Sequence, residues 1–193
     1  MNAEEWAHRL IEDIEPALRE LLASDPHLAL RDRYGLTLHR TATPPRQRGD
    51  GGTCDGMSIL EEGTIYYVPT PESRRENFTL LHELGHFLVR QADELLVWAA
   101  DLDDTSRVIE QICDHVAAGL LVPEELISQV LGSDNAGATQ VLELYRRSIA
   151  SREVCAIAIA RRLGCEGFVA VIDRGQRTVS FAARVADTWP YAW

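Results

Sequence analysis

The stretch 78–88 contains the pattern His-Glu-x-x-His, formed by His82, Glu83 and His86. Residues four apart lie on one side of a helix, so the two imidazoles would converge on one point, which suits a small divalent cation such as zinc. Glu83 lies roughly 100° further around the helix axis, from where its carboxylate could take a proton from a water held by the metal. The pattern therefore predicts a metal site in which Glu83 acts as a base.

Two histidines do not complete such a site, because catalytic zinc sites use three protein ligands and leave one position open. The longer pattern His-Glu-x-x-His-x-x-Gly-x-x-His is excluded, since Val89 and Ala92 occupy its last two defined positions. A carboxylate on a following helix is the other source, and we expect Glu110 to be the third ligand. Asp114, four residues on, would accept the outer N–H of His82 and fix its tautomer.

A competing interpretation treats His82 and His86 as packed or surface histidines and Glu110 as an ordinary solvated helix residue. It leaves the second carboxylate, Asp114, without a role as well. The metal site gives each of these side chains and Glu83 a function in one place, so we prefer it.

The elements around these residues follow from hydrophobic periodicity and from glycine and proline positions. In the first half of the sequence, these signals predict a helix over 3–23 that Pro16 kinks or splits, a strand over 36–39 and an exposed loop over 42–53. A hairpin over 57–68 and the motif helix over 72–91 follow. In the second half of the sequence, the same signals predict a surface loop over 93–104, either without regular structure or with a short turn at Leu95–Ala99. Four helices follow, over 105–121, 123–131, 138–149 and 151–163, and then a closing hairpin over 168–182.

This order of elements predicts an α+β protein. A small, mostly antiparallel sheet would pack on the active-site helix, followed by a helical C-terminal half and a final β-hairpin. We expect a core over 1–131 that holds the motif residues, and a helical flank with the hairpin over 132–193 on the same domain. Trp189 and Trp193 are expected to be packing anchors or an exposed patch for a partner.

Composition limits the partners and the location. The chain has 193 residues and a formal net charge of −11, which argues against direct nucleic-acid binding. Residues 138–163 resemble a helix-turn-helix, but this charge favours a helical flank of the domain that holds the metal site. The four cysteines are far apart, which indicates reduced thiols. No leader opens the chain and no apolar run approaches the roughly 20 residues of a membrane span, so we expect a cytoplasmic protein.

The segment around the motif resembles the active-site segment of the ImmA/IrrE family of metallo-endopeptidases, in which an Arg-rich run and Phe-Thr precede His-Glu-x-Gly-His. Here Arg74, Arg75, Phe78 and Thr79 fit. The stretch 110–123 resembles the family pattern Glu-x-x-Ala-Asn-x-Phe-Ala-Ala-x-Leu-Leu-x-Pro. Its Glu, Ala-Ala, Leu-Leu and Pro match, whereas Cys113, Asp114 and Val116 replace Ala, Asn and Phe.

The resemblance covers roughly residues 30–165 and implies a minimal zincin fold, a bound zinc and endopeptidase activity of narrow specificity. Manganese or another divalent ion would fit the same ligands. The substrate implied is a protein or peptide, with a helix-turn-helix transcriptional repressor as the expected partner. The alternative is a regulatory binding module that holds a repressor or toxin without cutting it.

Peptide hydrolysis also needs a donor to the tetrahedral oxyanion. The sequence offers His115, Tyr66 and Tyr67 as candidates for this role or for substrate contacts, and does not choose among them. The strand 64–68 precedes the motif helix, so as an exposed edge it would pair with an extended substrate. An ordinary internal strand is the alternative.

Overall fold

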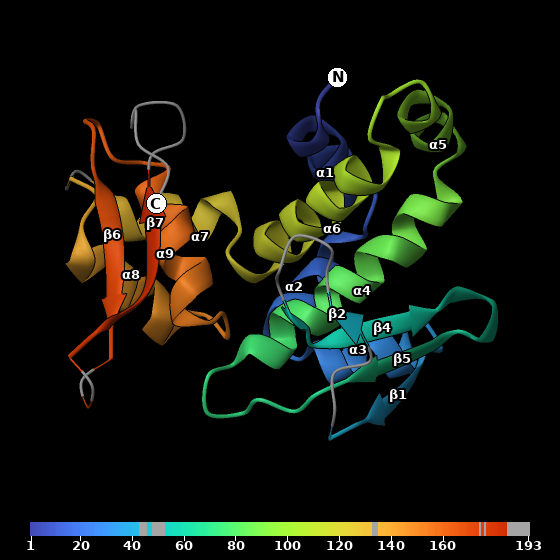
Figure 1. Ribbon diagram of the computed structural model, residues 1–193, viewed down its shortest axis with the longest axis horizontal. Helices are drawn as coiled ribbons and strands as arrows, with labels where there is room; N and C mark the ends of the chain where they lie inside the picture. Colours follow the sequence, from blue (N-terminus) through green and yellow to red (C-terminus); the bar gives the residue numbers. More distant parts are fainter. Residues whose placement is uncertain (43–45, 48–52, 133–134, 174, 176, 185–193) are drawn as a thin grey trace. The chain divides into compact units, whose positions relative to one another are not determined.

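The computed structural model describes residues 1–193 except 43–45, 48–52, 133–134, 174, 176 and 185–193 (Figure 1). The chain forms two compact units, Met1–Leu121 and Val122–Trp193. The domain boundary expected after residue 131, and the packing of 132–193 on the same domain, stay predictions. Trp189 and Trp193 lie outside the described residues.

The first unit begins with three helices, continues through short strands and ends in the helices that carry the motif residues. Its helices are α1 (Ala3–Glu12), α2 (Pro16–Ser24), α3 (Pro26–Asp32), α4 (Arg75–Gln91), α5 (Asp93–Ala100) and α6 (Thr105–Leu121). Its strands are β1 (Thr37–Arg40), β2 (Arg46–Gln47), β3 (Thr53–Cys54), β4 (Gly56–Ile59) and β5 (Thr64–Tyr67), with the 3-10 turn η1 (Leu60–Glu62) between the last two.

Capping residues and prolines set the N-terminal helices. The Asn2 side chain accepts from the backbone N–H of Glu5 at 3.0 Å, and the Glu5 carboxylate accepts from the backbone N–H of Asn2 at 2.9 Å, which closes a capping box. Pro16 splits the predicted helix 3–23, because it occupies the first turn of α2, where its missing N–H costs nothing. Asp25 is the C-cap of α2, and its side chain also caps the next helix, α3, which begins at Pro26.

The main sheet has the strand order β1-β5-β4. β5 is its central strand, pairing in parallel with β1 and antiparallel with β4. The strand predicted over 64–68 is therefore internal and does not offer an edge. β4 pairs with one side of it, and β1, from an earlier part of the chain, pairs with the other. Within the part of the chain that the structure describes, the edges of this sheet are β1 and β4.

Helices α4 and α6 lie side by side in the first unit (Figure 1). Leu80, Leu84 and Phe87 of α4 are buried, as are Ile112 and Val116 of α6. The sheet packs against α4 through β4 and β5. Burial of these apolar faces, worth roughly 1.5–3 kcal/mol for each large side chain, orders the two helices that carry the chemistry.

The two helices come very close together at Gly85. A Cβ at this position would lie 2.9 Å from the Cα of Cys113 and 3.1 Å from its Sγ. Real Cβ atoms essentially never approach a backbone atom so closely, so only glycine fits at this crossing. The absence of a side chain at Gly85 thus sets the spacing between α4 and α6.

The first part of the segment 93–104 forms the helix α5, which contains the predicted turn at 95–99 and is longer than it. Leu95 and Ala99 are buried, and the Trp98 ring packs 5.9 Å from that of Trp6 on α1. Packing of these apolar side chains explains a helix too short to be predicted from periodicity.

In its described residues the second unit forms three helices followed by a hairpin: α7 (Glu124–Leu131), α8 (Ala138–Arg147), α9 (Arg152–Ala160), β6 (Phe168–Ile172) and β7 (Val179–Arg184). Ser151 caps α9 by accepting from the backbone N–H of Val154 at 3.3 Å, as its position predicts. The hairpin packs on α9. Arg174, in the predicted turn, lies outside the described residues.

The predicted α+β class, with small sheets, a motif helix, a helical second half and a closing hairpin, is confirmed. None of the helices in the described ranges combines the length and apolar character needed to cross a bilayer.

Two glycine substitutions test the close approach of α4 and α6. We expect Gly85→Ala to lower the free energy of unfolding by roughly 1–3 kcal/mol, because the new methyl meets backbone. Gly119→Ala on α6 meets only the Cδ1 tip of Ile11 at 2.7 Å. Gly119→Ala should therefore lower the free energy of unfolding by less than Gly85→Ala does, because the Ile11 side chain can move and alanine favours the helix. Urea denaturation of both variants measures the difference, and equal losses would contradict the assignment.

Candidate metal centre

Two helices bring three potential ligands together. His82 and His86 lie one turn apart on α4, and Glu110 of α6 faces both rings. One oxygen of Glu110 lies 3.3 Å from Nε2 of His82, and the other lies 3.6 Å from Nε2 of His86. The ligand atoms of these residues all lie within 4.8 Å of one another. Glu110 thus bridges the two imidazoles.

The geometry fits a catalytic zinc-type site. Metal–ligand distances of roughly 2.0–2.2 Å in a tetrahedron place neighbouring ligand atoms roughly 3.3 Å apart, close to the spacing of Glu110 from the two rings. Two imidazole nitrogens and one carboxylate oxygen also form a donor set that zinc uses in hydrolases, with a fourth position left open. The residues present therefore fit a divalent cation.

Asp114 lies one turn beyond Glu110 on α6 and contacts the opposite nitrogen of His82. The Nδ1–H of His82 donates to Asp114 Oδ1 at 2.8 Å. This hydrogen bond fixes the tautomer that leaves Nε2 facing Glu110 and His86. The structure thus brings Asp114 into contact with His82, and its role in orienting this ring stays a prediction.

The surroundings of His82 favour its charged form. Burial of the ring opposes protonation, but the hydrogen bonds to Asp114 and Glu110 and the nearby carboxylate of Glu83 outweigh it. They raise the pKa of His82 from 6.5 to about 9. A cation at this point, whether a proton or a metal ion, is therefore electrostatically favoured.

Glu83 is 3% exposed and lies next to His82 on α4. It is not a member of the ligand group formed by His82, His86 and Glu110 among the described residues. A buried carboxylate beside the ligands but outside their set suits a base better than a fourth ligand.

The three oxyanion candidates occupy different settings. The Tyr67 hydroxyl accepts from Nε of Arg40 at 3.1 Å, and its buried ring packs edge-on against His27. Tyr66 stacks on His39 with ring centroids 5.1 Å apart. His115 follows Asp114 on α6 and is partly buried. Their roles in oxyanion or substrate binding stay predictions.

The N-terminal turn of α4 is held by contacts that the sequence did not predict. Arg75 forms an ion pair with Asp55 at 2.8 Å, just before β4. Thr70 and Glu76 bond reciprocally, each side chain accepting from the other's backbone N–H at 2.7 and 2.9 Å. Thr70 and Glu76 offered a signal that resembles a capping box with wider spacing, whereas nothing local marks Asp55.

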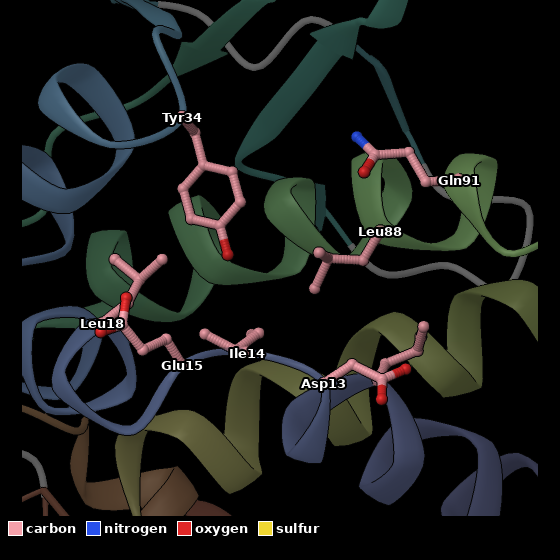
Figure 2. A pocket seen from close by; sticks show the side chains of 8 residues that line it. Asp13, Ile14, Glu15, Leu18, Tyr34, Leu88 and Gln91 are labelled. Atoms are coloured by element: carbon pink, nitrogen blue, oxygen red, sulfur yellow. The ribbon is translucent and has the colours of Figure 1, made fainter.

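A cavity of about 340 Å³ lies against α4, with Leu88 and Gln91 of this helix in its lining (Figure 2). Ile14 and Leu18 line it from the α1–α2 region, and Leu88 lines it from α4. The Tyr34 ring points into it in Figure 2, and burial raises the pKa of this phenol. Leu88 lies roughly 200° around the helix from His86, so the cavity opens on the opposite side of α4 from the ligands and is not the reaction site.

Comparison with known proteins agrees with this geometry. The peptidase M78 family model, described as the IrrE N-terminal-like domain, matches residues 16–160, and the chain belongs to this family. Two curated relatives are each named "Radiation response metalloprotease IrrE". The protein from Deinococcus deserti is 33% identical over 159 residues, 75% of this chain and 53% of the relative.

The protein from Deinococcus radiodurans is 29% identical over 142 residues, which cover 72% of this chain and 43% of the relative. This chain therefore spans about half the length of the curated relatives it matches. The resemblance to the ImmA/IrrE family is confirmed, and the family match includes both helices of the candidate metal centre.

The raised pKa of His82 predicts how the stability of the metal-free protein depends on pH. A proton that binds more tightly in the folded state stabilises the fold fully below pH 6.5, and this contribution is lost as the pH rises through about 9. We expect a loss on the order of 3 kcal/mol across this window. Asp114→Asn should reduce it, because an amide carries no charge to hold the imidazolium.

Urea denaturation in the presence of a chelator, repeated between pH 6 and pH 9.5, measures this dependence. The matched control is Asp103→Asn, which removes a carboxylate that lies outside the cluster. A parent protein with flat stability over this range, or an Asp114→Asn variant with the same slope as the parent, would contradict the interpretation of His82.

Proposed function

We propose that this protein is a zinc-dependent endopeptidase of narrow specificity. The observation that carries the proposal is the bridging of the His82 and His86 Nε2 atoms by Glu110, at 3.3 and 3.6 Å. In this proposal these three residues hold the metal ion, Asp114 orients His82, and Glu83 is the general base. Membership of the peptidase M78 family supports it.

A bound divalent cation would supply Lewis-acid polarisation of the scissile carbonyl and would make a nearby water more acidic. Glu83 accepts the proton of the attacking water and later delivers it to the leaving amine. Asp114 keeps the proton of His82 on Nδ1, so that Nε2 stays available as a ligand. The burial of Glu83 and its position next to His82 support this division of roles.

The substrate would bind in an extended conformation along β4. This strand is an edge of the sheet in the described part of the chain, and its residue Gly56 lies directly over Glu83. An extended peptide that adds to a sheet edge gains backbone hydrogen bonds in register. β4 therefore replaces the strand 64–68 as the proposed substrate edge, since both sides of β5 are already paired.

The proposed substrate is a partner protein, with a helix-turn-helix transcriptional repressor as the specific candidate. The resemblance to the ImmA/IrrE family supports this choice. We do not include direct nucleic-acid binding, because the net charge is −11. The positive side chains Arg147 and Arg162 of the second unit are also engaged, with Gln129 and Glu124 respectively. Cytoplasmic location stays a prediction.

Metal stoichiometry and cleavage, measured separately, test the proposed roles. We expect His82→Ala and Glu110→Ala to lose bound zinc, because two ligands do not hold it well. Glu83→Gln should keep the zinc and lose cleavage by about a hundredfold or more, since the amide cannot accept the proton. Glu72→Gln, which alters an exposed glutamate ahead of α4, is the matched control and should match the parent in both measurements.

The substrate assay would use a purified candidate helix-turn-helix repressor, such as the product of any neighbouring regulatory gene, with mass spectrometry of the products. Retained cleavage by Glu83→Gln would contradict the assignment of Glu83 as the base. Unchanged zinc content in both His82→Ala and Glu110→Ala would contradict the proposed metal site. A repressor that binds the parent protein tightly but stays intact would support the alternative, a regulatory binding module.

A further inference from the structure

Strand β4 passes over α4 with almost no clearance at Gly56. A Cβ built on Gly56 would lie 2.4 Å from Cγ2 of Thr79, 3.1 Å from Oε1 of Glu83 and 3.2 Å from its Cγ. Thr79 and Glu83 are four residues apart on α4 and so share one face of the helix. The backbone of the sheet edge therefore rests directly on the side chain proposed as the base.

Close approach, rather than backbone conformation, explains glycine at this position. The positive-φ glycines of the described residues are Gly35, Gly63 and Gly132, so Gly56 has a conformation open to other residues. Any other residue at this position would lack the space for its Cβ atom. A Cβ at position 56 would lie 2.4 Å from Cγ2 of Thr79, so one of the two groups would have to shift. Threonine in a helix has two favoured χ1 rotamers, so Thr79 could yield only by moving to its other rotamer or by displacing its neighbours.

Neighbouring contacts prevent β4 from simply lifting away. Asp55, the preceding residue, pairs with Arg75 at 2.8 Å, and its carbonyl accepts from the backbone N–H of Val68 at 2.8 Å. On the other side, Gly56 is in register with the buried Tyr67 of β5. A side chain at position 56 would therefore be accommodated largely by displacement of Thr79 and Glu83.

We propose that Gly56 is a positioning residue for the reaction. By leaving no side chain over α4, it allows the sheet edge to cover Glu83 and holds the Glu83 carboxylate in its buried position beside His82. A base that must meet a proton within hydrogen-bond reach tolerates little displacement, and a shift of about 1 Å can cost a hundredfold in rate. This role rests on the proposed peptidase function.

The test is a double-mutant cycle with Gly56→Ala and Thr79→Ser. Serine retains the hydroxyl of Thr79 but lacks Cγ2, the atom that lies 2.4 Å from the added Cβ. We expect Gly56→Ala to lower kcat by about a hundredfold, with KM changed less than about threefold and zinc content unchanged. In the Thr79→Ser background, the loss of kcat caused by Gly56→Ala should be at least about tenfold smaller, because the two residues are coupled through one contact.

The control for adding a methyl to a glycine is Gly119→Ala, which changes α6 away from Glu83 and should keep the parental kcat. Equal losses from Gly56→Ala in both backgrounds would overturn the proposal. So would a rise in KM at constant kcat, because that pattern assigns Gly56 to substrate binding alone. Unchanged kcat in Gly56→Ala would overturn it directly.

A second measurement does not depend on activity. Carbon-13 spectra of the glutamate carboxyl groups report on Glu83, whose resonance is assigned by its absence in Glu83→Gln. We expect this resonance to move in Gly56→Ala, to return toward its parental position in the double variant and to stay in place in Gly119→Ala. An unmoved resonance in Gly56→Ala would overturn the role of Gly56. Absence of cleavage by the parent protein would instead count against the proposed function alone.

Discussion

The close approach of α4 and α6 at Gly85 and Cys113 is the contact on which the candidate metal centre depends. Each helix contributes two polar residues four positions apart, and the inter-helix spacing decides whether the pairs meet. Because Gly85 carries no side chain, α6 comes near enough for Glu110 to reach both imidazoles and for Asp114 to reach Nδ1 of His82. The buried apolar faces on either side supply the free energy that maintains this contact.

A second close approach, at Gly56, covers the same helix from the sheet side. α4 is thus confined between α6, which supplies a carboxylate, and β4, which rests on Glu83. Both contacts use glycine for proximity and not for an unusual backbone conformation. The consequence is that the helix carrying the candidate ligands is fixed in place by close backbone contacts on two sides.

Local patterns predicted much of this arrangement. The four-residue spacings of His82–His86 and Glu110–Asp114 are helical signals, and α6 begins and ends at the predicted residues. The features that were missed depend on contacts distant in sequence. β5 became central because β1 pairs with it, α5 formed because Leu95 and Ala99 are buried, and the importance of Gly56 is visible only when Thr79 and Glu83 lie beneath it.

The equal spacing on the two helices also makes the centre simple to describe in terms of protein design. Each helix presents its pair as a rigid unit spanning little more than one turn, so the main variables are the separation, rotation and sliding of one helix along the other. A small residue at the crossing sets the separation. The same four side chains could be transplanted onto any antiparallel or crossed helix pair that meets at a glycine, without rebuilding a loop.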